Sequence, residues 1–264
     1  MSDEFLRQID WRQPWLAPLL PAAELVMTAS TWRDGLNAAA SVLGLENHRS
    51  IPLRFVPQAD LPAGIAYESF ISETGNVPTR DNLHDFFNAL VWLSYPSIKV
   101  QLNAMQAMEI DRRMQAAATT RGKLRDAATI FDENAVLFLT PNPQVGEMLR
   151  KHAWRKLFIE QRTLIQEECT IHLFGHALLE KLVMPYKAIT GHTWVIVAEP
   201  SIAAPHTTEM RDWLDATVAM HLRRGLDTSD FSHLPVLGVP GWWPTQDEHF
   251  YADAKVFRPL RQHS

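Results

Sequence analysis

The sequence predicts a mainly helical α+β fold in one domain, with a small, mostly antiparallel sheet. Apolar residues recur with helical spacing in several long segments, whereas only short runs alternate or are rich in β-forming residues. No repeat and no low-complexity linker marks a domain boundary in the 264 residues. We therefore expect a single domain over residues 1–264, with an N-terminal arm (1–21) and an irregular, aromatic-rich C-terminal tail (226–264) that wraps around the body.

The first half of the chain is predicted to be mostly helical. Trp and Pro recur in the arm, so its aromatic rings are expected to dock on the body. Leu53 and Phe55, flanked by prolines, indicate one short strand. The helical segments expected here are 22–43, a short helix and turn within 61–78, a helix that follows Thr79 and ends or kinks at Pro96, and 97–117.

The second half is predicted to mix short strands with helices. The run KLRDAATIFDENAVLFLTP indicates two strands joined by a turn at Asp132, Glu133 and Asn134, because these residue types favour turns. The remaining expected elements are helices at 144–166 and 208–224 and strands at 169–174 and 192–200.

Composition argues against several classes of protein. The net charge is -5, and the 25 basic residues form no long run, so we expect no nucleic-acid partner. The start MSDEFLRQIDW lacks a signal pattern, and no apolar run is long enough to span a bilayer, so we expect a cytoplasmic protein without a membrane partner. The single cysteine, Cys169, excludes an internal disulfide and a cysteine-rich zinc site, and its flanks indicate a buried, inert thiol.

The helix after Thr79 has an unusual polar face. At about 100° per residue, Asp81, His84, Asp85 and Asn88 share one side, opposite Phe and Leu side chains. Thr79 is expected to cap this helix, with Asp81 in its first turn. These residue types suit a divalent metal or a general base with an orienting partner. The alternative is an ordinary capped helix whose polar side chains bond to a neighbouring loop.

A second group comprises His172, His176 and Glu180. In one continuous helix, their spacing of four would put all three on one face, where they could hold a metal. The alternation over 169–174 favours a strand, a turn at Gly175 and a helix that begins near His176. In that arrangement His172 and His176 need not face each other.

Two arginines are candidates for binding substrate charge. Arg80 lies next to the first polar group, and Arg125 lies in RGKLRDA. A guanidinium can hold a carboxylate or phosphate with two parallel hydrogen bonds. Pairing of Arg125 with a neighbouring acid is the alternative.

Several segments carry a family resemblance. They are VPTRDNLHDFFNALVWL with YPSIKVQLNAMQ, RGKLRDAATIFDENAVL, LFGHALLEKLVMPYKAIT, LGVPGWWP and FYADAKVFRP. Through them the chain resembles the bacterial domain-of-unknown-function family 3025, from about Pro14 to Pro259. Ala135 stands where this family leads us to expect glycine. The resemblance implies kinship and no particular activity.

We expect the helices that bear His84 and His176 to face each other across one cleft. The leading hypothesis is a metal-dependent hydrolase for a small polar or anionic substrate, in which His84, Asp85 and His176 hold a divalent metal or one catalytic water. Asn88 and Asp81 would orient these groups. The alternative is a non-catalytic protein that binds a ligand or partner, with the polar residues forming a buried network. The oligomeric state stays open.

Overall fold

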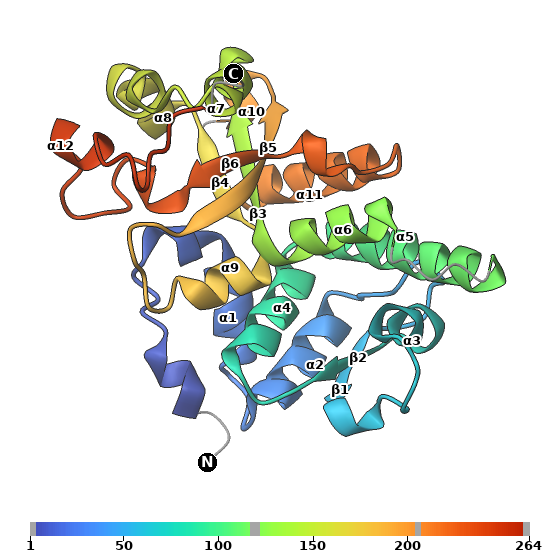
Figure 1. The fold of residues 1–264 in the computed structure, drawn as a ribbon. Helices are drawn as coiled ribbons and strands as arrows, with labels where there is room; N and C mark the ends of the chain where they lie inside the picture. The colour runs from blue at the N-terminus through green and yellow to red at the C-terminus, as the bar shows by residue number, and fades with distance from the viewer. Residues whose placement is uncertain (1–3, 117–121, 204–206, 261–264) are drawn as a thin grey trace.

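Helices carry most of the fold in residues 4–116, 122–203 and 207–260, which the computed structural model describes (Figure 1). They are α1 (Leu20–Val26), α2 (Trp32–Val42), α3 (Tyr67–Thr74), α4 (Leu83–Ser94), α5 (Pro96–Gln115), α6 (Lys123–Asn134), α7 (Gln144–Arg150), α8 (Arg162–Glu167), α9 (His176–Lys181), α10 (Pro200–Ala203), α11 (Thr208–Leu222) and α12 (Glu248–Tyr251). Two small sheets lie among these helices. The structure thus confirms the mainly helical α+β class.

The larger sheet is mixed. Its strands are β3 (Ala135–Thr140), β4 (Thr170–Leu173), β5 (Thr190–Val197) and β6 (Ser232–Pro235), in the order β4-β3-β5-β6. Both outer pairs are antiparallel, as expected, whereas the central pair β3–β5 is parallel. A parallel pair needs a long crossover, and the segment that contains α7, α8 and α9 provides it.

The smaller sheet pairs β1 (Arg54–Pro57) with β2 (Asn76–Thr79) in parallel. The sequence predicted β1, but it predicted a turn where β2 lies. The helix α3 connects the two strands, and Gly75 ends this helix with a left-handed backbone (φ 72°). Glycine adopts that conformation without steric cost, so the chain can leave α3 and enter β2 at once.

One segment has a different type of secondary structure from the one predicted. The run expected to form two strands begins with a helix, α6, and only its second half is a strand, β3. Ala127, Ala128 and Phe131 are fully buried on one side of α6, so helical packing outweighs the turn preference of the Asp-Glu-Asn sequence. Asp132 and Glu133 therefore lie in the last turn of a helix and not in a hairpin.

Two long predicted helices are divided. The segment 22–43 breaks between α1 and α2, where Thr31 caps α2 by accepting a hydrogen bond from the Asp34 amide. The segment 144–166 splits into α7, a π-helical turn at Lys156–Glu160 and all but the last residue of α8. Elsewhere the predicted helices at 97–117 and 208–224 match α5 and α11 within a few residues, although 117 lies outside the described residues.

The arm and the tail pack against the body and against each other. Trp15 is buried, and its ring centroid lies 5.9 Å from that of Trp242 in the tail. Gln246 fixes a turn of the tail by donating to the carbonyls of Leu237 and Val239. The tail is less irregular than expected, since it contains β6 and α12.

Cys169 is a free, buried cysteine, as the sequence indicated. Burial raises the pKa of its thiol to about 11, which disfavours the reactive thiolate. Among the described helices, none is both long enough and apolar enough to cross a membrane.

Candidate functional site

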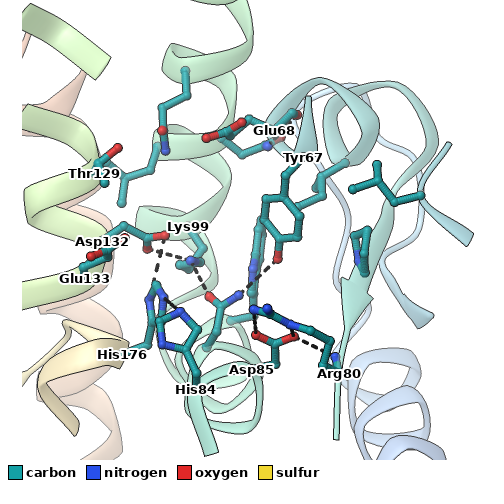
Figure 2. Close-up of a pocket in the computed structure, with 18 of the residues that line it drawn as sticks. Tyr67, Glu68, Arg80, His84, Asp85, Lys99, Thr129, Asp132, Glu133 and His176 are labelled. Atoms are coloured by element: carbon teal, nitrogen blue, oxygen red, sulfur yellow. Dashed lines mark hydrogen bonds and ion pairs between the residues drawn. The ribbon is translucent and has the colours of Figure 1, made fainter. Parts of the chain in front are cut away.

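A polar cavity of about 450 Å³ lies between α3, α4, α5, α6 and the start of α9 (Figure 2). Its charged lining residues are four carboxylates and two cations, together with two histidines: Glu68, Asp85, Asp132, Glu133, Arg80, Lys99, His84 and His176. Tyr67, Asn88, Trp92, Asn103 and Gln106 also line it. The polar face of α4 therefore points at a cavity and not at open solvent.

The start of α4 differs from the prediction. Asn82, and not Thr79, caps this helix, and its side chain accepts a hydrogen bond from the Asp85 amide at 2.8 Å. The Thr79 hydroxyl is already committed, because it donates to the Val56 carbonyl in the smaller sheet. Asp81 precedes the helix and pairs with Arg33 at 2.8 Å, so it does not line the cavity.

His84 of α4 and His176 of α9 meet at the cavity, as expected from the two sequence patterns. Their Nε2 atoms lie 3.0 Å apart, and their ring centroids lie 4.5 Å apart with an interplanar angle of 81°. We call these two side chains the imidazole pair. His84 is partly exposed, whereas the side chain of His176 is only 6% exposed.

Gly175 allows α9 to begin where it does. A Cβ atom at this position would lie 2.5 Å from the backbone of Asn134, the last residue of α6. The Gly175 amide donates to the Ala135 carbonyl at 2.9 Å. The first residue of α9, His176, is thereby held beside Asp132 in the preceding turn of α6.

Each outer nitrogen of the imidazole pair faces a carboxylate. Nδ1 of His84 lies 2.8 Å from Oε2 of Glu180, which is a hydrogen bond. Nδ1 of His176 lies 3.9 Å from Oδ2 of Asp132 and has no hydrogen-bond partner among the described residues. Burial lowers the pKa of His176 to about 4, although the nearby Asp132 acts in the opposite direction.

His172 does not belong to this cavity. It lies in β4, as the strand-then-helix alternative predicted, and its Nδ1 atom lies 2.6 Å from the buried hydroxyl of Tyr95. Glu180 therefore joins His84 and does not form a group with His172. The arrangement in which His172, His176 and Glu180 share one helix face is wrong, because Gly175 separates β4 from α9.

A chain of hydrogen bonds crosses the cavity floor. The buried ammonium of Lys99 donates to Oδ1 of Asp132 at 2.6 Å and to Oδ1 of Asn88 at 2.8 Å. Asn88 then donates through Nδ2 to the Tyr67 hydroxyl at 3.1 Å. Burial acts to raise the pKa of Asp132, but the charges of Lys99 and His176 outweigh it, so this pKa is lowered.

The sequence did not predict three site residues in this series of hydrogen bonds: Tyr67, Lys99 and Asp132. One signal was available in α5, where Lys99, Asn103 and Gln106 recur at helical spacing and are all buried. This stripe of one cation and two amides parallels the polar face of α4. No comparable local signal singled out Asp132 or Tyr67.

The two candidate arginines differ in position. Arg80 lines the cavity and holds Asp85 with two hydrogen bonds, Nε to Oδ2 at 3.0 Å and Nη2 to Oδ1 at 2.9 Å. The Arg80 amide also donates to Asp85, so both carboxylate oxygens accept from Arg80, and no hydrogen bond or ion pair joins Asp85 to the imidazole pair among the described residues. Arg125 lies 3.8 Å from Glu68 and is not a lining residue.

The protein atoms that could hold a metal ion are few. In the described ranges, no three His, Cys, Asp or Glu side chains are grouped so that they could hold one. The two Nε2 atoms of the imidazole pair remain. Two imidazole nitrogens that bind one tetrahedral zinc ion at about 2.0–2.1 Å would themselves lie about 3.3 Å apart, a few tenths of an ångström more than the observed 3.0 Å.

Fold and cavity together define a mainly helical α+β protein with a histidine-centred polar cavity. The profile of DUF3025, a family of proteins of unknown function, matches residues 53–261. The chain belongs to this family, and the matched span contains the whole cavity. Neither a curated protein nor a solved structure matches the chain.

Proposed function

We propose that the cavity is the active site of a hydrolase for a small polar substrate, with a divalent cation held between His84 and His176. One observation carries this proposal. The two Nε2 atoms face each other at 3.0 Å, while each Nδ1 atom faces a carboxylate.

The number of protons on the two imidazoles favours a cation between the rings. Two neutral imidazoles carry two protons, which are enough for the hydrogen bond to Glu180 and the hydrogen bond between the rings. The Nδ1 lone pair of His176 then opposes the Asp132 carboxylate at 3.9 Å, where an N–H group would be more favourable. With a cation between the rings, both Nε2 lone pairs would face the cation and both Nδ1–H groups would point at carboxylates. Metal-bound histidines commonly have such carboxylate partners. The alternative to a cation at this position is an additional proton on one of the two imidazoles.

The charge of the cavity supports the same assignment. The lining has four carboxylates and only two cationic side chains, and Arg125, outside the lining, lies near one of the four, Glu68. A divalent cation would offset the remaining excess of negative charge. Without the cation, the cavity would repel an anionic substrate, whereas with it a neutral or an anionic group could bind.

The side chains around the proposed cation site suggest how it would act on a substrate. The protein supplies two nitrogen donors, one fewer than the three protein ligands typical of catalytic zinc sites, so water and substrate would complete the coordination. The bound ion would lower the pKa of its water and so supply a nucleophile at neutral pH. Asp85 would hold Arg80 at the cavity, where the half-exposed guanidinium can contact substrate. We expect a cytoplasmic protein whose ligand is a small molecule.

A second candidate is a non-catalytic ligand-binding protein. The observation that favours it is the hydrogen-bonded chain from Asp132 through Lys99 and Asn88 to Tyr67, which would fix the packing of α4, α5 and α6 whether or not a reaction occurs. In that case the polar residues would serve stability and ligand binding alone.

Metal binding by protein purified without an affinity tag tests the proposal. We expect elemental analysis and zinc titration by calorimetry to show one bound ion per chain. Affinity should fall at least about tenfold in H84A and H176A, and by roughly 10- to 100-fold in E180Q. H249A, at an exposed histidine in α12, is the matched control and should bind zinc like the wild type. Absence of binding in the wild type, or equal binding in all variants, would contradict the proposal.

A further inference from the structure

The hydrogen bonds that reach Tyr67 have a fixed direction. An ammonium group can only donate, so the atom of Asn88 that faces Lys99 at 2.8 Å must be the amide oxygen. The amide nitrogen then faces the Tyr67 hydroxyl at 3.1 Å and donates to it. Lys99 thus determines the orientation of the Asn88 amide.

This direction leaves the hydrogen of the Tyr67 hydroxyl uncommitted. The phenol oxygen accepts from Asn88, and no described residue accepts the phenol hydrogen. The Tyr67 side chain is partly buried at the cavity, so its hydroxyl hydrogen is available to a partner that enters the cavity. Tyr67 lines the cavity, and Figure 2 shows its hydroxyl at the end of the ring nearer Asp85.

The surroundings of Tyr67 keep this hydrogen in place. Burial raises the pKa of the phenol, and the negative charges of Asp132 and Asp85 raise it further. A phenolate would therefore be strongly disfavoured at neutral pH, and the group is available as a hydrogen-bond donor.

We propose that Tyr67 donates its phenol hydrogen to an oxygen atom of the substrate. The substrate would accordingly carry a strong acceptor oxygen, of the carbonyl, carboxylate or phosphoryl type, and the bond would strengthen as that oxygen gains negative charge. Asn88 and Lys99 are positioning residues for this donor. No proton leaves Tyr67. The inference rests on the proposed function in one respect, since the acceptor oxygen would belong to the group that the cation binds.

Binding of simple oxyanions to the zinc-loaded protein tests the donor. Acetate and inorganic phosphate are titrated separately, because they distinguish a carboxylate-type from a phosphoryl-type ligand. We expect Y67F to weaken binding of the preferred probe about tenfold, the size expected for one hydrogen bond to a charged group, with zinc affinity unchanged. Y186F, at an exposed tyrosine outside the cavity, is the control and should behave like the wild type.

The direction of the hydrogen can also be observed without any metal. A neutron crystal structure of the zinc-free, full-length protein would locate the deuterium on the Tyr67 hydroxyl. A deuterium that points into the cavity supports the proposal. A deuterium shared with a protein acceptor, or equal oxyanion affinity in Y67F and wild type, overturns it. If the wild type retains no zinc, the proposed function fails by itself, and the neutron measurement still decides the role of Tyr67.

Discussion

The ammonium of Lys99 lies 2.6 Å from Oδ1 of Asp132, and the two side chains are 5% and 19% exposed. This ion pair joins α5 to α6 at the floor of the cavity. Lys99 also lies 5.2 Å from the centroid of the Trp92 ring, so its charge is surrounded by one carboxylate, one amide oxygen and one aromatic face. The pair links the two candidate functions, because it is part of the cavity wall and part of a buried network.

Lys99→Met should destabilise the protein by about 3–5 kcal/mol, because it leaves the Asp132 carboxylate buried without its cation. The double variant K99M/D132L should regain part of this loss, since it removes both charges together. Urea denaturation of the two single variants and the double variant would give the coupling energy. Lys151→Met, which breaks the exposed Lys151–Glu147 pair, is the control and should cost less than about 1 kcal/mol. Equal effects of K99M and K151M would contradict this account.

Asp85→Asn and Asp81→Asn should differ strongly in their effect on stability. Asp85 is buried and accepts three hydrogen bonds from Arg80, so the loss of its charge should cost about 2–3 kcal/mol. The Asp81 side chain is 49% exposed and pairs only with Arg33, so D81N should cost less than about 1 kcal/mol. Thermal and urea unfolding of both variants would measure the difference. A neutral or stabilising D85N would instead indicate a residue held for function at the expense of stability.

The free energy of unfolding of the metal-free protein should depend on pH through His176. The folded protein lowers the pKa of this histidine from 6.5 to about 4, so between these values the unfolded chain binds a proton that the folded chain does not. The contribution of His176 to the free energy of unfolding is therefore fully present above about pH 6.5. It is lost as the pH falls toward about 4, by an amount on the order of 3 kcal/mol. Urea denaturation over this pH range should show that the free energy of unfolding changes less steeply with pH in H176L than in the wild type. Parallel pH profiles for H176L and the wild type would refute the assignment.

Gly175→Ala should destabilise the protein and displace α9. The added methyl group would lie 2.5 Å from the Asn134 backbone, which cannot yield like a flexible side chain. We expect a loss of about 1–3 kcal/mol and zinc binding weaker than in the wild type, because His176 would move away from His84. Gly225→Ala offers a comparison with nothing within 4 Å of the new atom, although its φ of 110° adds backbone strain. Unchanged zinc binding in G175A would show that the imidazole pair does not depend on this close approach.

The sequence predicted those parts of the site that depend on local patterns. The polar face of α4 follows from helical spacing, and the change from β4 to α9 follows from alternation that ends at Gly175. Both histidines were found in this way. The meeting of the two helices was a hypothesis based on the polar residues that concentrate in the segments of family resemblance, and the structure brings His84 and His176 together.

The parts that the sequence did not predict depend on distant contacts. Asp81 shares a face with His84 in a helical projection, but Arg33, 48 residues earlier, draws it away. Asp132 belongs to a sequence typical of turns, and only the burial of Ala127 and Phe131 against the rest of the protein makes that segment helical. Lys99 resembles an ordinary surface lysine until its two acceptors, on α4 and α6, are known.

The order of the helices along the chain has a consequence for synthesis on the ribosome. His176 follows His84 by 92 residues, which takes roughly 5–20 s at about 5–20 residues per second. The helices α5 and α6 are synthesised during this interval, so Lys99 and Asp132 can meet while His84 still lacks its partner. A nascent chain that stalls before Gly175 would hold a half-built cavity open to water, and it would be a natural substrate for chaperones or proteases until α9 arrives.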